Sequence, residues 1–172
     1  MVVFCLTGPE STGKTTLSQA LAAHFEGECV AEYAREYVEK LDRKYNFYDI
    51  CRIACRQIEQ LEDAKKAENN LIFFDTDLII TKVWFELCYN KTPFFVTDYL
   101  KEPPVDCYLL CFPDIEWQND TVRENGTEQK RHFLFNKYKN EIEKTGKSYY
   151  IIEGEGEERL QNAINAVNLF LK

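Results

Sequence analysis

Apolar and polar positions alternate in blocks along the chain, and the blocks predict strands that take turns with helices. Short runs rich in apolar residues, typical of buried strands, occur at residues 2–6, 28–31, 71–74, 105–112 and 148–152. Strands that alternate with helical segments are typical of βαβ units, which place their strands in a parallel sheet. The pattern therefore predicts an α/β fold: a five-stranded parallel sheet flanked by helices on both faces.

Between these runs, apolar residues recur at the three- and four-residue steps that one helix face requires. The longest such stretch runs from Asp49 to Glu68, where Asn69 and Asn70 end it. Further helices are predicted at residues 16–23, from about 32, at 78–89, through Tyr99, at 133–144 and after Gly156. No repeat, linker or low-complexity tract interrupts the series, so we expect a single domain over residues 1–172.

A polar stretch near the start of the chain carries a phosphate-binding pattern. Residues 8–15 read Gly-Pro-Glu-Ser-Thr-Gly-Lys-Thr, which fits the P-loop pattern G-x-x-x-x-G-K-[ST]. The stretch lies between a predicted strand and a predicted helix, as a P-loop does. Backbone N–H groups of such a loop and the helix dipole attract anions, and glycines let the backbone approach a phosphate. The sequence therefore predicts a site for the phosphates of a nucleotide.

The P-loop residues are the first candidates for nucleotide binding. Lys14 is expected to reach the β- and γ-phosphates, and the hydroxyl of Thr15 is expected to coordinate Mg²⁺. The candidates are Gly8, Glu10, Ser11, Thr12, Gly13, Lys14, Thr15 and Thr16.

Acidic residues follow two other predicted strands, at the sheet edge where ligands of open α/β folds bind. Asp75 directly follows an apolar run and is the best candidate to complete the Mg²⁺ shell with Thr15, although it could instead cap the next helix. Asp77 and Glu32 are candidates for the base that orients or deprotonates an acceptor hydroxyl. Arg35 could hold substrate or phosphate, or pair with a neighbouring glutamate.

The polar segment at residues 113–132 has the composition of a lid. Arg123 and Arg131 flank a turn at Asn125–Gly126 and would bring cations onto the phosphates when the lid closes. Closure would exclude water, which would otherwise accept the phosphoryl group. A solvated charged loop, with Trp117 as a core anchor, is the alternative.

Nucleotide choice is only weakly encoded. Residues 90–93 read Asn-Lys-Thr-Pro, which lacks the aspartate of the guanine-reading N-K-x-D pattern. The chain also contains no D-x-x-G switch motif. These departures argue against a GTPase and favour ATP, with the turn at residues 154–156 as a candidate for backbone contact with adenine.

Composition excludes several other classes of protein. The net charge of −8 argues against a broad basic surface for nucleic acid. No apolar stretch reaches the about 18 residues of a membrane span, and no basic leader precedes the first strand. The seven cysteines form no C-x-x-C pair and the chain has two histidines, so a zinc site is not expected. Free cysteines favour a reducing cytoplasm, and the oligomeric state is left open.

Four motifs in this order resemble the ribosylnicotinamide kinase domain of NadR-type proteins. They are Gly8–Leu17, Glu32–Tyr37, Asp75–Asp77 and the Pro-Asp-x-x-Trp-x-x-Asp-x-x-Arg series at residues 113–123. The resemblance implies a nucleoside-kinase-like P-loop domain with a lid. It also implies ATP-dependent phosphorylation of the 5′-hydroxyl of nicotinamide riboside, which gives nicotinamide mononucleotide. The substrate-binding candidates are then Glu32, Tyr33, Arg35, Asp77 and Trp117, and the catalytic candidates are Lys14, Asp75, Asp77, Glu32 and Arg123.

The chain departs from this family at two points. The family places a tryptophan before the Glu-Tyr pair to pack on the nicotinamide ring, and here that residue is Ala31. Tyr33, Tyr37, Trp84 and Trp117 are the candidates to replace it. Two histidines cannot form an H-x-G-H adenylyltransferase motif at their spacing, so a stand-alone kinase domain is expected. A kinase of another nucleoside or metabolite, or a non-catalytic ATP-binding regulator, is the alternative.

Overall fold

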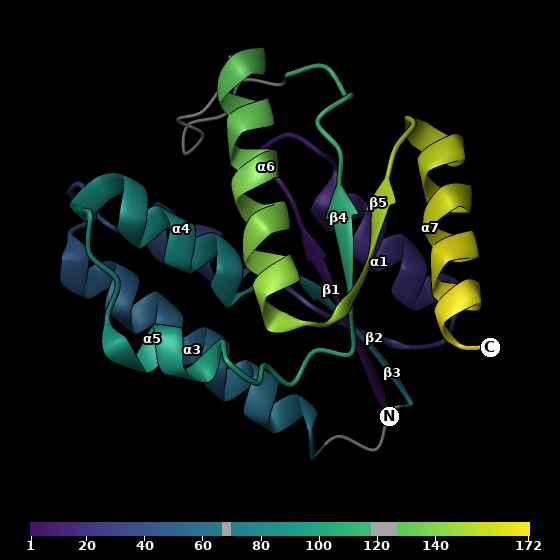
Figure 1. Ribbon diagram of the computed structural model, residues 1–172, viewed down its shortest axis with the longest axis horizontal. Helices are drawn as coiled ribbons and strands as arrows, with labels where there is room; N and C mark the ends of the chain where they lie inside the picture. Colours follow the sequence, from purple (N-terminus) through teal and green to yellow (C-terminus); the bar gives the residue numbers. More distant parts are fainter. Residues whose placement is uncertain (67–69, 118–126) are drawn as a thin grey trace.

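A computed structural model, which describes residues 1–66, 70–117 and 127–172, contains a parallel sheet with the strand order β2-β3-β1-β4-β5 (Figure 1). Every strand pair is parallel, so the predicted fold class is confirmed. The strands are β1 Val2–Thr7, β2 Glu28–Val30, β3 Leu71–Asp75, β4 Cys107–Cys111 and β5 Ser148–Ile152.

Helices cover both faces of this sheet (Figure 1). Helices α1 and α7 pack on one face, and α3, α4 and α6 pack on the other. Helix α5 lies against α3 and α4. The helices are α1 Lys14–His24, α2 Tyr33–Glu39, α3 Phe47–Ala64, α4 Leu78–Tyr89, α5 Phe94–Tyr99, α6 Glu128–Thr145 and α7 Gly156–Phe170.

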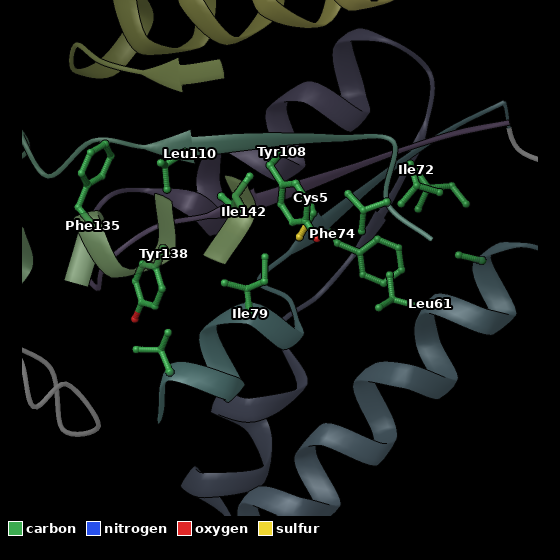
Figure 2. Packing of buried hydrophobic residues seen from close by; sticks show 14 of the residues in the cluster. Cys5, Leu61, Ile72, Phe74, Ile79, Tyr108, Leu110, Phe135, Tyr138 and Ile142 are labelled. Carbon is green, nitrogen blue, oxygen red and sulfur yellow. The ribbon is translucent and has the colours of Figure 1, made fainter. Parts of the chain in front are cut away.

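The central strand β1 is buried on both faces, which explains its unbroken apolar sequence. Val3 and Cys5 join the cluster beneath α3, α4 and α6, part of which Figure 2 shows. Phe4 and Leu6 join the cluster beneath α1 and α7. Alternate residues of a strand point to opposite faces, so β1 anchors both layers and holds the loop that follows it.

Two helix boundaries differ from the sequence prediction because capping residues move them. Helix α3 begins at Phe47, since the Asn46 side chain accepts the N–H groups of Tyr48 and Asp49 while Asp49 accepts the Asn46 N–H at 2.7 Å. It ends at Ala64, whereas the prediction continued to Glu68: Lys65 and Lys66 form a turn, and residues 67–68 lie outside the described residues. Helix α6 begins five residues before the predicted Phe133, at Glu128, because the Thr127 hydroxyl caps it.

The strand register brings several chain segments to one edge of the sheet. Leu6 of β1 pairs with Asp75 of β3, and Thr7 pairs with Leu110 of β4. The segments that follow these three strands, the P-loop, residues 76–77 and residues 112–117, therefore leave the sheet side by side. No helix in the described part of the chain has the length and apolar content needed to cross a bilayer.

Candidate active site

The P-loop folds as its glycines predict. At Gly8, φ is +154° and an added Cβ would lie 2.7 Å from the carbonyl oxygen of Cys111, so the loop can pass β4 only without a side chain there. Gly13 is the N-cap of α1 at φ 74°, a left-handed conformation that glycine adopts at least cost. The loop therefore delivers its N–H groups to the N-terminus of α1, where anions bind.

Side chains of the loop tighten it from within. The Thr12 hydroxyl donates to the carbonyl oxygen of Pro9 at 2.9 Å. Lys14 Nζ donates to the carbonyl oxygens of Gly8 and Pro9, at 2.9 Å each. The ammonium group therefore lies over the loop itself, where the phosphates of a nucleotide would meet it.

Two buried arginines hold the outer side of the loop. Arg131 donates from Nη2 to the Ser11 carbonyl at 3.0 Å and from Nη1 to the Ile115 carbonyl at 2.8 Å. Arg159 donates from Nη1 to the Thr12 carbonyl at 3.2 Å. Arg131 was predicted to contact phosphate, and here its guanidinium contacts the loop carbonyls. Sequence reasoning missed Arg159, although a cation in the first turns of a helix opposes the dipole and is a signal that could have marked it.

A cavity of about 1040 Å³ opens beside the loop and takes its lining from two groups of elements. One group comes from α7 and from the segment after β4, and it includes Ile115, Glu155, Gly156, Glu157, Arg159 and Leu160. The other group comes from the segments between β2 and α3 and from α4 and α6, and it includes Glu32, Arg35, Val38, Tyr45, Trp84, Leu87, Cys88 and Tyr138. All eight P-loop residues predicted to bind nucleotide line this cavity.

Glu32 and Arg35 bring opposite charges into the cavity lining. Glu32 precedes α2, and burial raises the pKa of its carboxyl group while the nearby charge of Lys14 opposes that rise. Arg35 Nε donates to Glu39 Oε1 at 3.1 Å, one helical turn later. The structure thus places one of the two predicted base candidates beside the P-loop lysine.

Asp75 is a buried carboxylate at the end of β3. It is 2% exposed, and neither of its carboxylate oxygens has a hydrogen-bond partner among the described residues. A buried carboxylate without partners is costly, and a metal ion would satisfy it. The described residues contain no cluster of three acidic, cysteine or histidine ligands. A Mg²⁺ ion would therefore need phosphate oxygens and water besides Thr15 and Asp75, as Mg²⁺ usually does.

Thr76 is held in a strained conformation between the two aspartates. Its φ is 77°, a left-handed conformation that costs a β-branched residue roughly 1–3 kcal/mol. Its N–H donates to the Leu6 carbonyl at 3.1 Å, and the residue lines the cavity. The sequence analysis included Thr76 only within the Asp75–Asp77 motif, because strain of this kind has no signature in residue type.

Asp77 is buried beneath the cavity and is not part of its lining. The Thr7 hydroxyl donates to its carboxylate at 3.4 Å. Although Asp77 is the N-cap of α4, its side chain forms no capping hydrogen bond of standard geometry with the described residues. Burial raises the pKa of Asp77 to about 7, and the nearby N–H groups of Ile79 and Ile80 limit the rise.

Two further predicted residues, Tyr33 and Trp117, lie outside the cavity lining. Tyr33 lines a different, shallow depression on α3, and Trp117 is half-buried outside the cavity lining. Arg123 lies outside the described residues. The aromatic surface of the cavity comes instead from Trp84, whose ring meets that of Tyr45 edge-on with centroids 4.7 Å apart.

Residues 3–159 match the sequence profile of an AAA domain family. The chain belongs to this AAA domain family. It also resembles the trifunctional NAD biosynthesis/regulator protein NadR of Salmonella typhimurium and of Escherichia coli, each 29% identical over 132 residues. These matches cover 73% of this chain and 32% of each relative, so the chain spans about a third of the length of the curated relatives it matches.

Several solved structures of other proteins share the fold of this chain. A crystal structure of NadR in complex with NR superimposes with a TM-score of 0.74 at 25% identity, covering 98% of this chain and 51% of that one. Deoxyadenosine kinase from M. mycoides (TM-score 0.65, 15% identity, 98% and 100% covered) shares the fold. Shikimate kinase from Acinetobacter baumannii also shares it, with a TM-score of 0.60 at 17% identity, covering 99% of this chain and 93% of that one. The fold is therefore that of P-loop kinases of small molecules.

Proposed function

We propose that the protein is an ATP-dependent kinase that phosphorylates a hydroxyl group of a nucleoside, with the 5′-hydroxyl of nicotinamide riboside as the leading acceptor. One observation carries the proposal: a P-loop with its lysine in place lines the same cavity of about 1040 Å³ as the Glu32 carboxyl group and an aromatic surface. The similarity to NadR supports the choice of acceptor.

The nucleotide half of the reaction falls to the P-loop. Its N–H groups and Lys14 bind the phosphates of ATP, and Thr15 together with Asp75 would hold Mg²⁺. When bound, Mg²⁺ neutralises charge on the β- and γ-phosphates, which lowers the barrier to phosphoryl transfer. The partnerless oxygens of Asp75 support this role.

The acceptor half of the reaction falls to residues from α2 and α4. Glu32 is the better placed of the two base candidates, because it lines the cavity and Asp77 does not. Its carboxylate would accept a hydrogen bond from the acceptor hydroxyl and take the proton as the phosphorus–oxygen bond forms. Trp84, with Tyr45 against it, offers the ring surface that Ala31 cannot supply.

A lid over residues 113–132 remains part of the proposal. Arg123 and Arg131 would approach the transferring phosphoryl group from this segment and stabilise the charge that spreads over its oxygens. For Arg131 this requires the guanidinium to leave the Ser11 and Ile115 carbonyls that it now contacts.

The test is a coupled ADP-release assay over a panel of acceptors. We expect ATP turnover with Mg²⁺ to rise when nicotinamide riboside is added, and to rise less with adenosine, cytidine or shikimate. Stimulation by a different acceptor would support the assignment as a kinase and change the proposed substrate. Slow ATP turnover that no acceptor stimulates would contradict the proposal and favour a nucleotide-binding regulator.

A further inference from the structure

A buried arginine at the start of α7 joins three separate segments at the nucleotide end of the cavity. Arg159 is 3% exposed and donates to the Thr12 carbonyl at 3.2 Å, the Phe112 carbonyl at 3.0 Å and the Gly154 carbonyl at 2.7 Å. It also forms an ion pair with Asp114. Asp114 in turn accepts the N–H of Gly154 at 2.8 Å.

This contact set fixes the direction in which the P-loop presents its N–H groups. The C=O of Thr12 and the N–H of Gly13 belong to one planar trans peptide, so they point in opposite directions. Arg159 holds the carbonyl on the outer side of the loop. The N–H of Gly13 is thereby kept available to the inner side, where phosphate would bind.

The same guanidinium also positions the turn before α7. Gly154 is held through its carbonyl by Arg159 and through its N–H by Asp114. The next residues, Glu155, Gly156 and Glu157, line the cavity together with the P-loop. Arg159 therefore ties this turn to the loop through its hydrogen bonds to the Gly154 and Thr12 carbonyls.

We propose that Arg159 and Asp114 are positioning residues for an adenine nucleotide. They set the separation between the P-loop, which holds the phosphates, and the turn at residues 154–156, against which the base packs. The inference rests on the proposed function. It adds two residues that do not touch the nucleotide but position the backbone segments that bind it.

A purely structural role does not account for this pair. The Asp114 side chain is 28% exposed, so its removal leaves no cavity in the core. Helix α7 is anchored independently by Ala163, Ile164 and Val167, which are buried against the sheet. A cation in the first turns of a helix is also unfavourable for the helix itself.

Calorimetric titrations with ATP and with inorganic tripolyphosphate test the proposal, because the second ligand has the phosphates without the base. In Asp114→Ala the contact of Arg159 with the Thr12 carbonyl is kept, and the turn loses the carboxylate that accepts the Gly154 N–H, one of its two side-chain contacts. We expect the Kd for ATP to rise about tenfold, the equivalent of one charge-assisted hydrogen bond, and the Kd for tripolyphosphate to change less than about twofold. In Arg159→Lys both Kd values should rise, since an ammonium group cannot reach three carbonyls at once.

Arg43→Lys is the matched control. Arg43 forms an ion pair with Asp49 at the start of α3, and neither residue lines the cavity, so both Kd values should stay at the wild-type level. An unchanged ratio of the two Kd values in Asp114→Ala would overturn the inference while leaving the proposed function intact. Wild-type protein that binds neither ligand would overturn the proposed function and this inference together.

Discussion

The two ends of the cavity are built in different ways. The end proposed for the nucleotide is made largely of backbone: the P-loop lines it together with residues 155–156, and two buried arginines donate hydrogen bonds to carbonyl groups of the P-loop. The acceptor end is made of side chains such as Glu32, Arg35 and Trp84, which come from separate elements. The geometry of the first end therefore depends on the backbone, whereas that of the second depends on the identity of each residue.

This difference tells us where specificity can change without loss of chemistry. A substitution at the nucleotide end disturbs a loop that every phosphoryl transfer needs. A substitution at the acceptor end changes the shape offered to one substrate. Ala31, which stands where NadR-type kinases are expected to have tryptophan, belongs to the second class, and the ring surface of Trp84 is its candidate replacement.

The largest effect is expected from removing the P-loop lysine. Lys14→Ala should lower kcat by at least about 100-fold, because its charge meets the phosphoryl group during transfer. Lys130→Ala, which removes another lysine of the cavity lining, should lower it by only a few fold. The measurement is steady-state ADP release with circular dichroism as a check of folding, and equal losses in the two variants would contradict the assignment.

A second large effect is expected at the buried carboxylate of β3. Asp75→Asn should lower kcat roughly 100-fold and raise the Mg²⁺ concentration needed for half-maximal activity. The free energy of unfolding should stay equal or rise, since the wild-type carboxylate has no partner among the described residues. Thermal denaturation without metal checks this, and a marked fall in Tm would show that Asp75 is structural.

At the acceptor end, Trp84→Ala should raise the KM for nicotinamide riboside about tenfold through loss of ring packing. The KM for ATP should not change, because the P-loop is untouched. In Trp84→Phe, which keeps an aromatic ring, the KM for nicotinamide riboside should stay close to the wild-type value. Trp117→Phe is the control outside the cavity lining, and a larger effect there than at Trp84 would reverse the assignment of the ring surface.

Between the two ends, Asp77 offers a pH-dependent comparison. Burial raises the pKa of Asp77 to about 7 from its ordinary value of 3.8. Between these pH values the unfolded chain has lost the proton and the folded chain keeps it, so the free energy of unfolding falls as the pH rises toward 7. Asp77→Asn cannot ionise, so its stability relative to wild type should increase from pH 4 to pH 8, by at most about 1.4 kcal/mol per pH unit.

Urea unfolding at pH 5 and at pH 8 measures this difference. Asp49→Asn is the control: hydrogen bonds from Arg43 lower the pKa of Asp49, so its carboxylate is ionised at both pH values and the variant should lose the same amount of stability at pH 5 and at pH 8. The ionised carboxylate of Asp49 stabilises the fold above pH 4, and that contribution is lost as the pH falls through the folded-state pKa. A stability difference between Asp77→Asn and wild type that is the same at both pH values would contradict the account.

The smallest effect is expected at the strained residue between the aspartates. Thr76→Gly should change the free energy of unfolding by less than about 1 kcal/mol. Glycine adopts the left-handed conformation without strain, and this gain offsets the entropic cost of ordering a glycine. Thr81→Gly, in α4, should cost about 2 kcal/mol, because Thr81 donates to Gln57 at 2.7 Å from inside a helix. Equal costs in urea unfolding would show that Thr76 is not strained.

The fold could be predicted from the sequence because its signals are local. The five apolar runs become the five strands, and the P-loop pattern marks its own turn and helix start. The starts of α3 and α6 were placed too late, since the prediction followed apolar periodicity and overlooked Asn46 and Thr127 as caps.

The cavity lining could be predicted most completely where a single motif supplies it. All of the predicted P-loop residues line the cavity, because the loop fixes their positions within a few residues. Tyr33 and Trp117 were named from the family resemblance and lie outside the lining. Arg159 is far from the loop in sequence; its place at a helix start could have marked it as unusual, but its contact with the loop is visible only in the tertiary structure.

The central claim is that the loop at residues 8–15 binds the phosphates of ATP. A crystal structure with a non-hydrolysable ATP analogue, Mg²⁺ and nicotinamide riboside tests it most directly. The account predicts phosphate oxygens on the N–H groups of this loop, with the ribose hydroxyl beside Glu32. Nucleotide bound elsewhere on the protein would contradict it.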